Sequence, residues 1–85
     1  MKFTVIWTKE AEDRLAGLWL AAADQQAVAR ASDAIDHQLA RNPHGVGEER
    51  IPNFRILFQP PLAVTYEVRD ADRQVKVWAV WRPPL

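Results

Sequence analysis

Three side chains of this 85-residue sequence are candidates for acid–base chemistry or for holding a phosphate group: His44, Arg55 and Arg82. His44 precedes a glycine in a polar loop, where an imidazole could act as an acid or a base near neutral pH. Arg55 and Arg82 could anchor a phosphate, because a guanidinium is a planar fork of hydrogen-bond donors. Metal-free cleavage of a phosphodiester needs an acid, a base and fixed cations in one place. The sequence shows few such groups, so this chemistry is one alternative among several.

Each candidate also has a purely structural interpretation. Alternation along its strand places Arg55 on the outward face near Glu67, where a surface ion pair contributes about 0–1 kcal/mol. A single loop histidine is usually only solvated, and His37, on the polar side of a helix, is expected to contact Asp33 or Arg41. Two distant histidines without any cysteine do not make a zinc site. With no phosphate-binding glycine loop and no Ser-His-Asp arrangement, we expect neither a metal nor a cofactor.

The four tryptophans indicate another kind of function, the binding of a protein partner. Trp7 and Trp19 fall on apolar stripes and are expected in the core. Trp78 and Trp81 lie three positions apart in one strand, so alternation points them to opposite faces. At least one is then exposed or covered by a partner, since tryptophan is a common interface anchor; the alternative is a tryptophan folded over its own sheet edge. Arg69, in the same hairpin, is a further candidate contact.

Composition indicates one globular domain covering residues 1–85, with 48% hydrophobic and 26% charged residues. Eleven basic residues balance eleven acidic ones. Nucleic-acid binders usually carry a basic excess, so we expect no direct DNA binding by the chain alone. No apolar run approaches the ~20 residues of a membrane span, and no signal peptide is visible. The lack of cysteine fits a cytoplasmic location.

The elements that must position these residues follow from periodicity and from turn residues. Apolar residues alternate in the strands and recur at helical spacing in the helices. The expected elements are, in order, a strand over 2–7, helices over 9–22 and 24–41, a loop over 44–50, a strand over 53–59 and a hairpin over 62–81. Two helices with so short a connection form an antiparallel hairpin.

This β-α-α-β-β-β order predicts an α+β fold, in which the helical hairpin packs on one face of a mainly antiparallel four-stranded sheet. The apolar face of the hairpin strands must be covered, because two strands alone are only marginally stable. We expect the helices to cover this face. The helical side chains expected in the contact are Leu18, Trp19, Ile35 and Leu39, and they should pack on Val64, Tyr66, Val68 and one face of residues 75–81.

Three stretches in this register resemble the RelE/ParE toxin superfamily of bacterial type II toxin–antitoxin systems. They are FTVIWTKEAEDRL (3–15), AIDHQLARNPHGVG (34–47) and PLAVTYEVRDADRQVKVWAVW (61–81). Because they extend from residue 3 to residue 81, the resemblance covers nearly the whole chain. The resemblance implies a growth-inhibiting toxin, of the kind associated with plasmid stabilisation, that a cognate antitoxin neutralises. It also implies one of two targets: RelE-like members cleave mRNA on the ribosome, and ParE-like members poison DNA gyrase.

Carried over residue by residue, the resemblance to RelE-like ribonucleases is incomplete. Arg55 and Arg82 lie near positions of two basic residues of that group. Leu57, expected to point outward, and Ala63 stand where further basic residues are typical. The resemblance therefore favours a toxin that acts by protein contact, either as a gyrase poison or as a catalytically weakened homologue. The alternative is an mRNA interferase that uses Arg55, Arg82 and His44.

Overall fold

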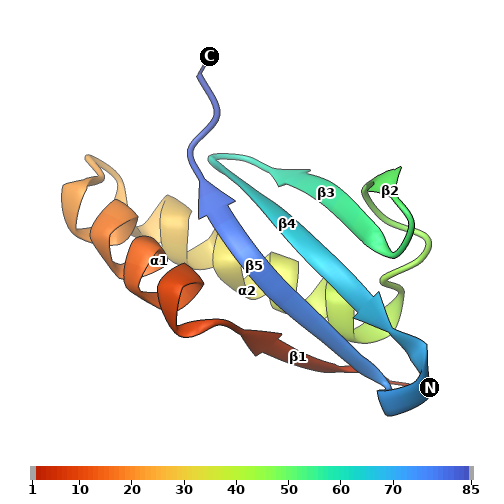
Figure 1. Cartoon of the computed structure of the whole chain (residues 1–85). Coiled ribbons are helices and arrows are strands. Elements are labelled where there is room, and N and C mark those ends of the chain that lie inside the picture. Colours follow the sequence, from red (N-terminus) through yellow and green to blue (C-terminus); the bar gives the residue numbers. More distant parts are fainter. Residues whose placement is uncertain (1, 85) are drawn as a thin grey trace.

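Each helix of the helical hairpin begins at a residue whose side chain caps its first turn. A computed structural model describes residues 2–84 (Figure 1). In it α1 spans Lys9–Ala21 and α2 spans Gln25–Arg41. The hydroxyl of Thr8 accepts a hydrogen bond from the amide of Ala11 at 3.1 Å, and the carboxylate of Asp24 accepts one from Ala27 at 3.0 Å. Each cap satisfies an amide that the first helical turn leaves without a partner.

The sheet has five strands rather than the four expected. They are β1 (Thr4–Trp7), β2 (Glu48–Ile51), β3 (Phe54–Gln59), β4 (Leu62–Arg69) and β5 (Gln74–Trp81), with a short 3-10 turn, η1 (Asp70–Asp72), between the last two. Their order is β1-β5-β4-β3-β2; β1 runs parallel to β5 and the other pairs are antiparallel. The additional strand β2 was predicted as a loop, because three of the four residues in its sequence Glu-Glu-Arg-Ile are charged. In the structure all four of its side chains are exposed.

Both helices cover the same face of the sheet, and the core lies between the two layers (Figure 1). Ile35 and Leu39 of α2 are fully buried, as are Val64 and Tyr66 of β4, so the predicted packing of α2 is confirmed. The prediction for Trp19 is wrong: its side chain is 40% exposed and borders a hollow between α1 and α2. The apolar stripe of α1 therefore faces partly toward α2 rather than toward the sheet.

A bulge in β5 changes which way its tryptophans point. Tyr66 lies opposite Val77 and Thr65 lies opposite Ala79, so Trp78 is an extra residue in the strand. An extra residue resets the alternation of side chains. Val77 therefore faces the helices while Trp78 and Ala79 do not. Trp81, opposite Ala63, follows the new alternation. The expectation of opposite faces was wrong: Trp78 and Trp81 share the face that the helices leave uncovered.

Strand β3 has the opposite orientation to the one predicted. Leu57 lies opposite Val64 and is only 7% exposed, so it faces the helices, whereas Phe58 is 53% exposed. Arg55 lies opposite Tyr66 and is also on the helix side. Apolar residues occur on both sides of this strand, and its pairing with β4 decides which side is buried. No helix within residues 2–84 is long and apolar enough to cross a membrane.

Candidate functional site

The face of the sheet opposite the helices, here called the outer face, carries several exposed apolar side chains. Four of its large hydrophobic side chains are exposed, and they come from four different strands: Ile6, Ile51, Phe58 and Trp78. Phe54 and Ile56 of β3 add to it, because they pair with outward-facing residues of β4. Of these residues, Ile51, Phe54, Ile56 and Phe58 lie on the neighbouring strands β2 and β3. A large exposed apolar patch on a small soluble protein is typical of a binding site. The outer face is thus the first candidate functional surface.

Trp78 is held in a fixed orientation on the outer face by charged neighbours. Its indole Nε1 donates to a carboxylate oxygen of Glu67 at 3.1 Å, and the same oxygen accepts from Nε of Arg69 at 3.2 Å. The ammonium of Lys76 lies 4.4 Å from the centre of a Trp78 ring, within range of a cation–π contact. The predicted partner-binding residues Trp78 and Arg69 thus both donate a hydrogen bond to the carboxylate of Glu67. An aromatic ring already fixed in place loses less conformational entropy when a partner binds.

Arg55, predicted as a phosphate anchor, instead binds the backbone of the loop before β2. Its Nε donates to the carbonyl of Val46 and its Nη2 to the carbonyl of Gly47, both at 3.1 Å. Gly47 has φ +69°, and a Cβ there would lie 2.7 Å from the carbonyl oxygen of Ile56. Two of the donors of the guanidinium are therefore used within the protein. The expected pairing of Arg55 with Glu67 does not occur, because the two side chains lie on opposite faces of the sheet.

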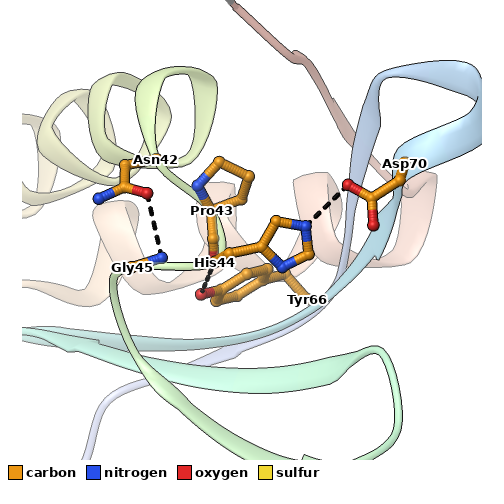
Figure 2. Close-up of polar contacts among 6 residues, drawn as sticks. All are labelled: Asn42, Pro43, His44, Gly45, Tyr66 and Asp70. Carbon is orange, nitrogen blue, oxygen red and sulfur yellow. Dashed lines mark hydrogen bonds and ion pairs between the residues drawn. The ribbon is translucent and has the colours of Figure 1, made fainter.

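Figure 2 shows three contacts of the loop between α2 and β2, one within the loop, one with Tyr66 of β4 and one with the 3-10 turn. Asn42 accepts a hydrogen bond from the amide of Gly45 at 3.1 Å. The hydroxyl of Tyr66 lies 2.8 Å from the carbonyl oxygens of both Pro43 and Val46. It has one proton, so it donates to one of the two at a time. Tyr66 was predicted in the core; its ring is in the core and its hydroxyl binds the loop.

The third contact is a hydrogen bond between His44 and Asp70 of the 3-10 turn. Nε2 of the imidazole lies 2.7 Å from a carboxylate oxygen of Asp70 (Figure 2). Both side chains are more than half exposed. His44 was expected to be solvated or to act as an acid or base. The carboxylate orients its ring, which is how a catalytic histidine is also held. Asp70 was not singled out in the sequence, because nothing in a separation of 26 residues signals the contact.

Burial raises the pKa of Tyr66, and the nearby Arg55 guanidinium partly opposes this shift through hydrogen bonding and charge. The side chain has no solvent exposure, so the phenolate would lose its hydration. Tyr66 therefore remains a neutral hydrogen-bond donor at physiological pH. Its position beneath the loop suits a structural role.

The three candidate catalytic residues do not converge. His44 contacts the turn that precedes β5, whereas Arg82 follows the last residue of β5. β5 has eight residues, so at about 3.3 Å per residue its first and last residues are roughly 23 Å apart. Arg55 lies on the helix side of β3 and is bound to the loop. Among residues 2–84, no group of three His, Cys, Asp or Glu side chains is placed to hold a metal ion.

The chain matches no family model, and no curated protein matches its sequence. Solved structures, however, match its fold over almost the whole length. The toxin–antitoxin complex RelBE2 from Mycobacterium tuberculosis gives a TM-score of 0.80 at 20% identity, with 98% of this chain and 93% of that chain covered. The ParDE system of P. aeruginosa gives 0.71 at 15% identity, with 98% of each chain covered.

The isolated E. coli RelE toxin gives a TM-score of 0.69 at 12% identity, covering 98% of this chain and 86% of that one. All three identities are low, so what is shared is the arrangement of the backbone. That arrangement is the one that the resemblance of the sequence implies. The prediction is confirmed at this level: the chain has the fold of the RelE/ParE toxin superfamily.

Proposed function

We propose that this chain is the toxin of a type II toxin–antitoxin pair and that it acts by protein contact, with a cognate antitoxin as its inhibitor. The observation that carries the proposal is the apolar outer face, on which Trp78 is fixed by Glu67 and Lys76. Solved structures of this fold include toxin–antitoxin complexes of both the RelE and ParE kinds. The resemblance of the sequence to the RelE/ParE superfamily implies that the target of this toxin is either mRNA on the ribosome or DNA gyrase.

Protein contact is favoured over RNA cleavage by the placement of the cations. A phosphoryl transition state needs donors fixed around one point, and loss of one such donor typically costs ~10²–10³ in rate. Here Arg55 is bound to loop carbonyls, and Arg82 and His44 lie toward opposite ends of β5. Leu57 is buried and Ala63 has no polar group, so neither supplements them. The gyrase target is therefore the preferred one.

An antitoxin would find both an anchor and a strand edge on this surface. β1 pairs only with Gln74–Val77, so among the described strands the second half of β5 has a neighbour on one side only. An extended segment can pair with such an edge through its backbone. Trp78 and Trp81 lie in that half of β5 and would contact the same segment. Binding to the native state alone would stabilise it by about 4 kcal/mol at a thousandfold excess over Kd.

The first experiment is to express the chain under an inducible promoter, alone and together with the product of an adjacent short reading frame. We expect growth arrest from the chain alone, and a soluble complex with a higher melting temperature on co-expression. Transcripts on translating ribosomes should stay intact, and arrest should persist in His44→Gln and Arg82→Ala. Codon-phased cuts that disappear in either variant would instead establish the mRNA interferase and refute action by protein contact.

A second experiment locates the binding surface. Trp78→Ala should abolish arrest or weaken capture of the antitoxin. Leu20→Ala is the matched control, because Leu20 is an exposed apolar residue of α1, on the helix side of the molecule. Purified chain should also inhibit gyrase supercoiling in a manner that requires Trp78. Equal behaviour of the two variants in every assay would show that the outer face is not the binding surface.

A further inference from the structure

A polar hollow lies at the C-terminal end of α2, on the helix side of the molecule and away from the outer face. Its volume is about 430 Å³, and it is lined by Lys2, His37, Ala40 and Arg41. The amide of Phe3 donates to the carbonyl of Ala40 at 2.8 Å, which fixes the start of the chain beside the end of the helix. The proposed toxin function uses none of these residues.

The residues that line this hollow are mainly basic, whereas the chain as a whole is neutral. The chain is neutral overall, yet three of the four lining residues are basic and none is acidic. Within residues 2–84, neither Lys2 nor Arg41 forms an ion pair with a carboxylate. The adjacent carboxylate of Asp36 accepts a hydrogen bond at 2.7 Å from the indole of Trp7.

The side chains of His37 and Arg41 are already close together. Nη1 of Arg41 lies 3.4 Å from Nε2 of His37, one helical turn away. A guanidinium only donates, so in this contact the imidazole is neutral and accepts at Nε2. An anion that joins Arg41 and His37 would let the ring take up a proton and donate instead.

We propose that this hollow binds a phosphate group. The fork of Arg41 can hold two oxygens of one phosphate, the ammonium of Lys2 adds a compact charge, and His37 adds a third donor when it is protonated. Three groups from two separate segments then surround one anion. The phosphate group can come from a small free polyphosphate or from a nucleic-acid backbone, and the two sources present the same chemistry to these side chains.

The site can be tested by NMR, because the chain has only two histidines. Pyrophosphate is titrated at constant ionic strength and pH 7 while the ring Cε1 protons are observed. We expect a saturable movement of the His37 signal toward the position of a protonated ring. The signal of His44, which is paired with Asp70 at another place, should stay nearly still and serves as the internal reference.

Variants test which charges bind the anion. Lys2→Gln and Arg41→Gln should each weaken pyrophosphate binding about fivefold or more, the effect expected for one charge close to the anion in water. Arg30→Gln removes a charge elsewhere on the exposed surface of α2 and should leave the affinity unchanged. Competition by a ten-nucleotide RNA would assign the site to a nucleic-acid backbone; failure to compete would assign it to small polyphosphates.

Two results would overturn the proposal. One is a shallow change that affects His37 and His44 alike, which would reflect general screening of charge. The other is an affinity that is the same in the double variant Lys2→Gln/Arg41→Gln as in the unaltered chain. In that case the cations serve only to balance the partial negative charge at the end of α2, and their removal would change stability alone.

Discussion

Removal of one oxygen atom, in Tyr66→Phe, should weaken the attachment of the loop to the sheet. The hydroxyl is 2.8 Å from two carbonyl oxygens, those of Pro43 and Val46. A buried acceptor left without a donor costs about 1–3 kcal/mol. Arg55 still donates to Val46, so only the carbonyl of Pro43 loses this donor. We therefore expect a loss near the lower end of that range, about 1–2 kcal/mol in the free energy of unfolding.

The same substitution should remove a pH dependence at alkaline pH. The pKa of Tyr66 is raised in the folded chain, whereas in the unfolded chain it has the usual value of about 10. Below pH 10 both states are protonated and the contribution is complete. Above pH 10 the unfolded state releases the proton first, so it binds fewer protons and the stability of the fold decreases with pH until the folded pKa is passed. Phenylalanine has no titrating proton, so this decrease in stability should be absent from the Tyr66→Phe variant.

The measurement is urea unfolding of both proteins from pH 7 to pH 11, with tyrosinate absorbance followed in parallel. Tyr66 is the only tyrosine in the chain, so the absorbance reports this residue alone. Lysines and arginines titrate in both proteins and cancel in the comparison. A stability difference that stays constant above pH 10, or a tyrosinate transition centred at or below pH 10, would refute the argument from burial.

Three further predictions test the packing, the loop and the ion pair. Leu39→Ala should cost about 2–5 kcal/mol, because the side chain is fully buried between α2 and the sheet; a near-neutral effect in thermal unfolding would contradict this position. Gly47→Ala should destabilise, since its φ is +69° and a Cβ would meet backbone atoms, whereas Gly17→Ala in the open helical position should stabilise by about 0.5–1 kcal/mol in the same assay. Asp70→Asn should change stability by less than about 1 kcal/mol, because its pair with His44 is largely exposed; a larger loss on chemical denaturation would assign the pair a structural role.

Periodicity and turn residues were sufficient to predict the helices and four of the five strands. Thr8 and Asp24 mark the start of each helix, and the apolar stripe of α2 identifies its buried residues Ile35 and Leu39. These signals are local, because each depends on residues within one or two turns. The order of the elements then restricts the fold, since a helical hairpin must cover one face of a sheet.

Features that depend on pairing between strands could not be predicted in this way. β3 has apolar residues on both sides, so only its register with β4 shows that Leu57 is buried and Phe58 exposed. The bulge at Trp78 is also a property of two strands, and no glycine or proline in β5 signals it. β2 is paired on one side only and all four of its residues are exposed, so no alternation marks it as a strand.

The candidate site depended on these same features, which explains why its residues were only partly predicted. Arg55 was predicted on the outer face because the orientation of β3 was reversed. Trp78 and Trp81 were predicted on opposite faces because the bulge was not visible. The contacts of Glu67 with Trp78, and of Asp70 with His44, join residues distant in sequence. Residue types therefore indicated the candidate functional side chains, while the register of strand pairing determined which of them are in contact.

In the proposed function, the two faces of the sheet separate stability from binding. The buried core lies on the helix side, together with the loop attachments made by Tyr66 and Arg55. Substitutions of these residues will change folding, so a loss of toxicity in Arg55→Ala cannot by itself identify a phosphate anchor. Trp78 lies on the outer face, outside that core, and its loss leaves Glu67 still paired with Arg69. Under the proposed function, substitution on the outer face should abolish binding while the fold remains. Growth arrest that is lost in Trp78→Ala but kept in His44→Gln and Arg82→Ala would therefore separate a protein-binding toxin from a ribonuclease.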